Sequence, residues 1–413
     1  MPELIVVGAG AAGLYTALCA AREGARVALI SALPLAETAS YWAQGGLAAA
    51  LAMEDSPGQH LEDTLAAGRG LVRRSAAEVL CREAPERFAD LVALGVRFDA
   101  DAEGRFELGL EGGHRVRRIV HAGGSATGRR LLRTLAARVV ADPLIEVREG
   151  LRVIALAQTD DRVDGAHLDD GSALAARAVV LASGGGAALW SRTTNPPGSW
   201  GSGMLLARAA GADLADLEFV QFHPTAVTGV AGREGFLVTE AIRGEGATLH
   251  GPAGERFVDE LAPRDAVARA IFRLMREAGA DHVDLDMRHV DPARFPNVFA
   301  ALRDAGLDAT RVPVPVAPAS HYMMGGVATD LEGRAIPGLY AVGEVACTGL
   351  HGANRLASNS LSECFVFGRR AALAGLQEPG AAQPGTAAGP PPEAPSRATR
   401  EAMWRLAGLE RNA

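Results

Sequence analysis

The sequence predicts an α/β fold whose main layer is a doubly wound parallel sheet. The chain opens with an apolar strand at residues 4–7, a helical stretch at 11–22 and a second strand at 26–30. This strand–helix–strand order produces parallel pairing. Two more apolar strands, at 178–182 and 339–342, end in glycines or in a carboxylate. Ligands of doubly wound sheets bind at such strand ends.

The spacing of these strands predicts the domain organisation. If the last two strands share one sheet, the segment between them contains an insertion. We place it at residues 222–322, which are rich in His, Arg and Pro, so that 1–221 and 323–376 form the main domain. Residues 377–396 hold mostly Pro, Gly and Ala, a composition typical of a linker. Residues 397–413 are predicted to form one short helix.

Composition excludes several classes of protein. Of the 413 residues, 48% are hydrophobic, which suffices for a sizeable core. The net charge of −8 offers no basic surface for nucleic acid. All 41 basic residues are Arg, so no lysine Schiff base can hold pyridoxal phosphate. The four cysteines lack metal-ligand spacing, so we expect no metal site and a reducing cytoplasm. No apolar run reaches membrane-spanning length.

A glycine-rich turn joins the first strand to the first helix. Its three glycines, in the order GxGxxG, permit a tight turn, close approach of a pyrophosphate and close packing of helix on strand. The positive end of the helix then faces the phosphates. We therefore predict dinucleotide binding by Gly8, Ala9, Gly10, Ala11, Ala12 and Gly13.

The second strand lacks the acidic residue that usually binds a ribose hydroxyl. Ser31 and Ala32 stand at its end. Ser31 either donates one hydrogen bond to the ribose or merely ends the strand, and both readings stay open. No Arg replaces the acid, so nothing indicates a 2′-phosphate.

Two further segments favour a flavin dinucleotide. A loop with paired glycines can lie along a flat ring system, and it comprises Ala39, Ser40, Tyr41, Trp42, Ala43, Gln44, Gly45 and Gly46. Near the end of the chain, a strand leads into Glu344, whose carboxylate can accept from ribose or ribityl hydroxyls. A helix predicted to start near residue 360 would direct its N-terminal amides at the flavin pyrimidine edge. The residues expected there are Asn354, Ser358, Ser360 and Leu361, although simple helix capping by the two serines stays open.

A second group of residues is suited to a small dicarboxylate. Each carboxylate needs two or three donors, and Arg can supply a bidentate pair. A structural role for any single member stays open. The candidate donors are His223, His321, Arg264, Arg355 and the hydroxyl of Thr239.

Seven separated motifs resemble one family, that of the succinate dehydrogenase and fumarate reductase flavoproteins and the L-aspartate oxidases. The resemblance covers residues 3–376. It implies an FAD-binding Rossmann-like domain and an inserted capping domain. The motifs are the GAGAAG turn, the AQGG loop, QFHP from Gln221, TEAIRGEG from Thr239, APRD from Ala262, HYMMGG from His321 and HGANR from His351.

Smaller features favour the L-aspartate oxidase branch. Respiratory members usually attach FAD to a His at the position of Ala39, so here the FAD is expected to be non-covalent. The segment EGGH from Glu111 resembles the oxidases, in which this carboxylate faces the substrate ammonium. A solvated loop charge is the alternative for Glu111. Glu363 also fits the oxidases, because the dehydrogenases usually carry Asp there.

The resemblance implies oxidation of L-aspartate to iminoaspartate, with hydride transfer to the flavin and reoxidation by oxygen or fumarate. The product would feed quinolinate and NAD synthesis, with quinolinate synthase as a possible partner, and the protein would be a cytoplasmic monomer or weak dimer. Arg264 would be the catalytic arginine, its role left open because a guanidinium pKa lies above about 12. The implied site residues are Arg264, His223, His321, Arg355, Glu111, Thr239, Glu240 and Gln221.

Several positions depart from the family pattern. Ala32 replaces a usual Lys, and Ser125 and Ser202 replace usual Asp residues. Lost polar contacts cost about 1–3 kcal/mol each where buried, so we expect weak FAD binding. Of the three-helix C-terminal domain of the oxidases, we expect only the first helix.

Three alternatives remain open at this stage. One is a soluble fumarate reductase or succinate-oxidising flavoprotein, which Glu111 argues against. Another is a catalytically weakened flavin-binding paralogue, which the complete His and Arg set argues against. The third is an NAD-dependent dehydrogenase, which would not need the AQGG loop or Glu344.

Overall fold

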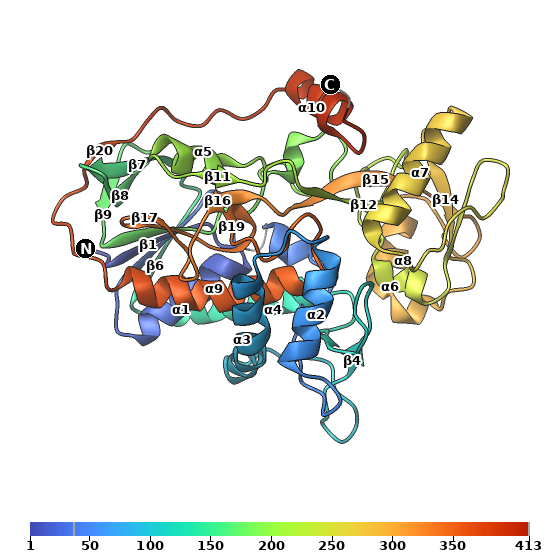
Figure 1. The fold of residues 1–413 in the computed structure, drawn as a ribbon, viewed down its shortest axis with the longest axis horizontal. Helices are drawn as coiled ribbons and strands as arrows, with labels where there is room; N and C mark the ends of the chain where they lie inside the picture. Colours follow the sequence, from blue (N-terminus) through green and yellow to red (C-terminus); the bar gives the residue numbers. More distant parts are fainter. Residues whose placement is uncertain (36–37, 412–413) are drawn as a thin grey trace.

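The computed structural model describes residues 1–35 and 38–411 (Figure 1). Its central layer is a six-stranded sheet in the order β17-β18-β10-β1-β2-β6. All neighbours in this sheet are parallel except β17, which is antiparallel to β18. The strands are β1 Leu4–Val7, β2 Val27–Ser31, β6 Ile145–Glu149, β10 Ala178–Leu181, β17 Arg334–Ile336 and β18 Leu339–Ala341. The predicted α/β fold with a parallel sheet is confirmed.

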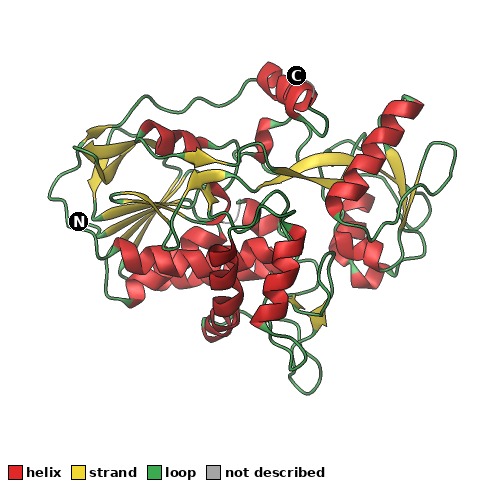
Figure 2. Ribbon diagram, in the orientation of Figure 1, coloured by secondary structure: helices red, strands yellow, loops and turns green. Residues whose placement is uncertain are grey.

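Different layers cover the two faces of this sheet (Figure 2). Because strand side chains alternate, Leu4 and Val6 pack on the helical side, whereas Ile5 and Val7 pack on the other. The helices of the first side are α1 Ala11–Arg22, α3 Arg74–Ala93, α4 Thr127–Ala141 and α9 Asn359–Gly375, with α2 Pro57–Ala67 beside α3. The second side is covered by α5 Ser202–Ala209 and an antiparallel sheet of β7 Val153–Thr159, β8 Arg162–Leu168 and β9 Ala173–Ala175.

A second body with its own hydrophobic core lies at one end of the molecule (Figure 1). Its antiparallel sheet has the order β12-β15-β14-β13. The strands are β12 Val220–Val227, β13 Thr248–His250, β14 Val283–Asp286 and β15 Val314–Met323, and the helices are α6 Glu240–Gly244, α7 Arg264–Ala278 and α8 Pro296–Asp304. This body contains both helices and strands, as predicted for the insertion, while its boundaries at residues 222 and 322 stay a prediction.

The described residues also form two small three-stranded sheets. One comprises β11 Leu214–Ala215, β16 Gly326–Ala328 and β19 Ala346–Cys347, and the other β3 Leu47–Ala48, β4 Leu108–Gly109 and β5 Ile119–Val120. In the described part of the chain, no helix combines the length and apolar character needed to span a bilayer.

The segment expected to be a plain linker is attached to the body. Its two-residue strand β20, Thr386–Ala387, pairs with β7, and the Gly385 amide donates to Asp164 at 2.9 Å. Backbone groups can pair in this way whatever the side chains, so composition alone does not reveal it. Helix α10, Arg397–Ala407, follows and places Trp404 against Phe222.

Candidate functional site

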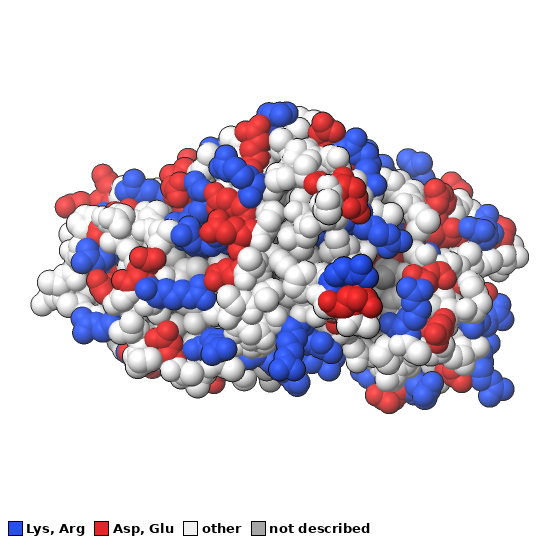
Figure 3. All heavy atoms as spheres, turned by 90° about the horizontal axis from the view of Figure 1, so that it is seen from below, with Lys and Arg blue, Asp and Glu red and all other residues white. Residues whose placement is uncertain are grey.

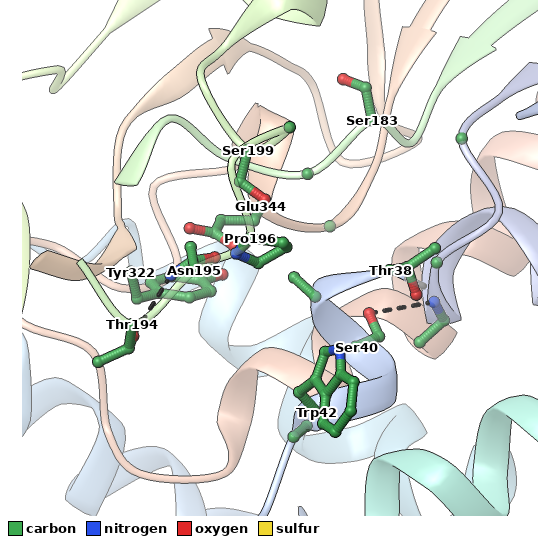
Figure 4. A pocket seen from close by; sticks show the side chains of 18 of the residues that line it. Thr38, Ser40, Trp42, Ser183, Thr194, Asn195, Pro196, Ser199, Tyr322 and Glu344 are labelled. Atoms are coloured by element: carbon green, nitrogen blue, oxygen red, sulfur yellow. Dashed lines mark hydrogen bonds between the residues drawn. The ribbon is translucent and has the colours of Figure 1, made fainter. Parts of the chain in front are cut away.

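The carboxyl ends of β1, β10 and β18 open into a cavity of about 810 Å³. Loops of the second body form its opposite wall, and Figure 4 shows part of the lining. The size lies within the range of small-molecule and cofactor sites. Most of the predicted site residues therefore lie around one space, although they are distributed over more than 350 residues of sequence.

The glycine turn forms one end of the cavity. Gly8 has φ 110°, and a Cβ there would overlap the Ala182 carbonyl. A Cβ on Gly13 would overlap the Gly8 carbonyl, so Gly13 serves helix–strand packing and does not line the cavity. Gly10 has an extended backbone and precedes α1 directly. The positive end of α1 therefore faces the open space.

The loop at residues 39–46 lies against this turn. Its first part is the 3-10 helix η1, Ala39–Trp42. The Ala11 amide donates to Ser40 Oγ at 3.3 Å, which ties the loop to the start of α1. Seven of its eight residues line the cavity. The exception is Tyr41, whose hydroxyl accepts from Arg133 at 3.2 Å on the outer side, so the prediction that Tyr41 binds the cofactor is not supported by its position.

Polar groups without protein partners line the wall beside the turn. Among the described residues, the hydroxyls of Thr38 and Ser183 are buried and lack hydrogen-bond partners. Both side chains line the cavity (Figure 4). A buried hydroxyl without a partner is costly. The Ser183 hydroxyl points towards α5, where a Cβ on Gly203 would overlap its oxygen. Of the two, the Thr38 hydroxyl is therefore the one that a polar ligand in this space would complete. This observation fits a dinucleotide.

Glu344, shortly after β18, also lines the cavity. Its Oε1 accepts from the Met323 amide at 3.0 Å. Burial raises the pKa of Glu344 to about 7. Hydrogen bonds from ligand hydroxyls would stabilise the ionised carboxylate. Ser31, Ala32 and Ser202 also line the cavity, but the Ser31 hydroxyl donates to the Leu33 carbonyl at 2.5 Å.

Two serines at the start of α9 line the cavity, and neither caps the helix with its side chain. Ser358 has φ 62° and makes no side-chain cap; its hydroxyl donates to Glu111 Oε2 at 2.6 Å. Ser360 Oγ accepts from Arg355 Nη1 at 2.9 Å. Leu361 lines the cavity as well, whereas Asn354 does not. The Asn354 amide instead donates to the Ala67 carbonyl at 3.1 Å, which corrects its predicted place.

The other end of the cavity holds two arginines joined by one glutamine. Gln221 Oε1 accepts from Arg264 Nη1 and from Arg355 Nη2, each at 3.1 Å. Arg264 Nε also donates to Glu240 Oε2 at 2.6 Å. Gln221 itself does not line the cavity. Its geometry is that of a residue that positions both guanidinium groups, rather than of a catalytic residue.

Arg355 differs from Arg264 in having no carboxylate within 4.0 Å among the described residues. Its side chain is 6% exposed. Burial lowers the pKa of Arg355 to about 10, so the group remains a cation at neutral pH. It is therefore a buried positive charge available to an anionic ligand.

Two histidines lie beside these arginines. The rings of His223 and His321 are 5.2 Å apart, and Thr194 Oγ1 lies 2.8 Å from His321 Nδ1. Burial, with Arg264 as a further cause for both, lowers each pKa well below its usual value, so both imidazoles are neutral at pH 7. His223 Nδ1 accepts from the Thr225 amide at 3.3 Å. In a neutral ring this leaves Nε2–H as a donor.

Glu111 supplies the opposite charge at the same end. Besides Ser358, its carboxylate lies 3.4 Å from His121 Nε2. Although burial opposes ionisation, the hydrogen bonds from His121 and Ser358 lower the pKa of Glu111 to about 2. Glu111 is therefore ionised and not a solvated loop charge. Thr239 and Glu240 line the cavity nearby.

Residues that sequence reasoning did not single out complete this wall. Thr194 contacts His321, and Asn195 Nδ2 donates to the His321 carbonyl at 2.7 Å. Tyr322 also lines the cavity (Figure 4), and the guanidinium of Arg355 lies over its ring. Thr194 and Asn195 stand more than ten residues beyond the end of β10, after the 3-10 helix η2 (Ala187–Leu189), so no strand-end signal marked them in the sequence.

The comparisons with known proteins agree with this geometry. The model of the FAD binding domain family matches residues 3–361. A Streptomyces coelicolor protein named L-aspartate oxidase is 49% identical, over 90% of this chain and 67% of its own length. A Caulobacter vibrioides protein of the same name is 47% identical, over 99% of this chain and 83% of its own length. Among solved structures, E. coli quinol fumarate reductase FrdA superposes with a TM-score of 0.86 at 33% identity, over 91% of this chain and 70% of that chain.

The fold is thus that of an FAD-binding flavoprotein, and its cavity lies between the parallel sheet and the second body. The chain belongs to the L-aspartate oxidase family.

Proposed function

We propose that this protein is an FAD-dependent enzyme that oxidises L-aspartate to iminoaspartate. The observation that carries the proposal is the pairing of charges at one end of the cavity. Arg355 is a buried cation without a carboxylate partner among the described residues, and Glu111 is a buried, ionised carboxylate in the same wall. A ligand with carboxylates and an ammonium group complements both.

The cofactor end of the cavity supports FAD without a covalent link. The glycine turn and α1 would hold the pyrophosphate, and Glu344 and the residue 39–46 loop would contact the rest of the molecule. Ala39, at the position where relatives attach FAD, has no group that could form the bond. When bound, FAD accepts the two electrons lost from the substrate and returns them to oxygen or fumarate.

The protein side chains have distinct roles in this proposal. Arg355, with the neutral donors His223 and His321, binds the carboxylates, and Thr239 assists. Glu111 accepts hydrogen bonds from the ammonium group and orients the Cα–H bond. With its pKa near 2, Glu111 is a poor base, so its role is electrostatic. Arg264, held by Glu240 and Gln221, orients and polarises the substrate.

Replacing Glu111 by Gln tests the charge pairing. The variant loses a charged hydrogen bond to the ammonium group, which is worth about 1.5–3 kcal/mol. We expect kcat/KM for L-aspartate to fall about 10- to 150-fold. Fumarate lacks the ammonium group, so its reduction should change much less. Glu107→Gln, at an exposed position of the same loop region, is the matched control. Equal losses for aspartate and fumarate would contradict this role.

Arg264→Leu tests the assignment of the catalytic arginine. It leaves Glu240 without its closest cation and removes a donor from the cavity. We expect turnover with both aspartate and fumarate to fall by at least about 100-fold, as when one electrostatic donor is removed from an active site. Turnover near the wild-type rate with both substrates would exclude the assignment.

The structural likeness to fumarate reductases favours a second candidate, a soluble fumarate reductase. The two candidates share the His and Arg set and differ in the need for Glu111. Succinate and fumarate offer no cation to this carboxylate, so their binding gains nothing from an ionised Glu111.

A further inference from the structure

A buried cluster beneath Arg355 takes no part in the function described so far. Tyr322 on β15 donates its hydroxyl to Glu363 Oε2 at 3.1 Å. His351 Nε2 lies 2.9 Å from the same oxygen, and Thr348 donates to Glu363 Oε1 at 2.8 Å. The Glu363 side chain is 1% exposed and does not line the cavity. The cluster therefore fixes the phenol from three elements: β15, the loop after β19 and α9.

The ring of Tyr322 lies under the guanidinium of Arg355. The distance from Arg355 Cζ to the ring centroid is 4.6 Å. An aromatic face stabilises a cation that burial has removed from water. It does so without occupying the N–H edges of the guanidinium, whereas a carboxylate partner would bind those edges and compete with an anionic substrate.

The remaining contacts of Arg355 fix its plane. Gln221 holds Nη2 and Ser360 holds Nη1. Gln221 on β12 pairs with Tyr322 on β15. The register of these two strands therefore positions both the amide that contacts the edge of the Arg355 guanidinium and the ring that contacts its face. Arg355 Nε is buried and, among the described residues, has no partner.

We propose that Tyr322 and Glu363 are positioning residues for Arg355: Glu363 fixes the phenol, and the phenol ring holds the guanidinium at the angle that binds a substrate carboxylate. The inference rests on the proposed function only in assigning Arg355 to carboxylate binding. The length of the Glu363 side chain matters, because its carboxylate spans Thr348 on one side and Tyr322 on the other.

The test measures malonate binding to the oxidised holoprotein by isothermal titration calorimetry. Malonate has two carboxylates but a single methylene, so it cannot be dehydrogenated, and it carries no ammonium group. We expect Tyr322→Leu to weaken malonate binding about tenfold or more, as expected for loss of a desolvated cation–π contact. Tyr322→Phe keeps the ring and should weaken binding about threefold.

A double-mutant cycle separates positioning from general stability. Tyr322→Phe and Glu363→Gln disrupt the same hydrogen bond, so the double variant should bind malonate no more weakly than the weaker-binding single variant. Tyr340→Phe is the matched control, because Tyr340 also donates to a buried carboxylate, Glu378, at 3.1 Å, away from the cavity. It should lower the melting temperature and leave malonate binding unchanged.

Two results would overturn the inference: malonate affinity within twofold of wild type in Tyr322→Leu, or additive losses in the cycle. Neither depends on aspartate being the substrate. If the wild-type protein fails to oxidise aspartate while the malonate pattern holds, the proposed function fails and the positioning of Arg355 stands.

Discussion

On the cofactor side of the cavity, Ser202 is a clear departure from the family pattern, which usually has Asp at this position. It lines the cavity at the first position of α5. An Asp there would offer two acceptor oxygens to cofactor hydroxyls, where Ser offers one. We expect Ser202→Asp to tighten FAD binding about 5- to 10-fold, measured by titration of flavin fluorescence. Ser75→Asp, an exposed position in the first turn of α3, controls for the helix effect of an added acid. Nanomolar FAD binding by the wild-type chain would contradict the expected weakness.

The sequence predicted which polar side chains belong to the site, because their chemistry suits the ligand. It did not predict how far each side chain reaches towards the cavity. Strand alternation places Gln221 and His223 on one side of β12 and Phe222 on the other, against Trp404. The sequence therefore indicated both polar side chains. It could not show that Gln221 stops short of the cavity and bridges two arginines. The pairing of β12 with β15 is irregular between Gln221 and Phe222, a local feature that the sequence pattern does not predict.

At the scale of elements, the turn before α1 makes a sharp prediction. A Cβ on Gly10 would meet nothing closer than Ser40 Oγ at 3.2 Å, the end of a movable side chain. Gly10→Ala should therefore fold, while its methyl group projects towards the pyrophosphate space. We expect a melting temperature of the apoprotein near the wild-type value and FAD affinity reduced at least about tenfold. Gly58→Ala, in α2, is the control. Unchanged FAD affinity in Gly10→Ala would place the pyrophosphate elsewhere.

The contact between α2 and α9 predicts a pH dependence of stability. His60 Nε2 lies 2.7 Å from Asn359 Oδ1, and burial lowers the pKa of His60 to about 4. Below the ordinary value of 6.5, the unfolded chain binds a proton that the folded chain does not. The contribution of neutral, buried His60 to the free energy of unfolding is therefore fully present above pH 6.5 and is lost as the pH falls from 6.5 to 4. Between those values, the urea unfolding free energy should change by about 1 kcal/mol less per pH unit in His60→Gln than in wild type. The exposed His282→Gln should match wild type, and an equal slope in all three proteins would contradict the argument.

Elements were predictable where periodicity is strong. The five parallel strands include the four predicted ones, each within one or two residues of its expected ends. The antiparallel β7–β9 layer and strand β20 were not foreseen. β20 is only two residues long, and its pairing depends on backbone groups that carry no sequence signal.

At the scale of the whole molecule, the proposed function places the cofactor at the end of the cavity formed by the parallel sheet and the substrate at the end shared with the second body. Acidic and basic side chains are interspersed over the face shown in Figure 3. The charges on which the proposed function depends, Glu111, Arg264 and Arg355, lie in the cavity. Sequence motifs indicated both ends because they combine glycines with polar or charged side chains, whether they follow a strand, start a helix or, like QFHP in β12, lie within a strand. The closeness of Glu111 and Arg264, over 150 residues apart, depends on the packing of the two bodies.

The central claim is that this cavity oxidises an amino dicarboxylate in preference to a simple one. The most direct measurement is anaerobic mixing of the FAD-loaded protein with L-aspartate, and separately with succinate, while the flavin band near about 450 nm is followed. We predict bleaching with L-aspartate and much slower or no bleaching with succinate. Bleaching with succinate but not with L-aspartate would contradict the claim.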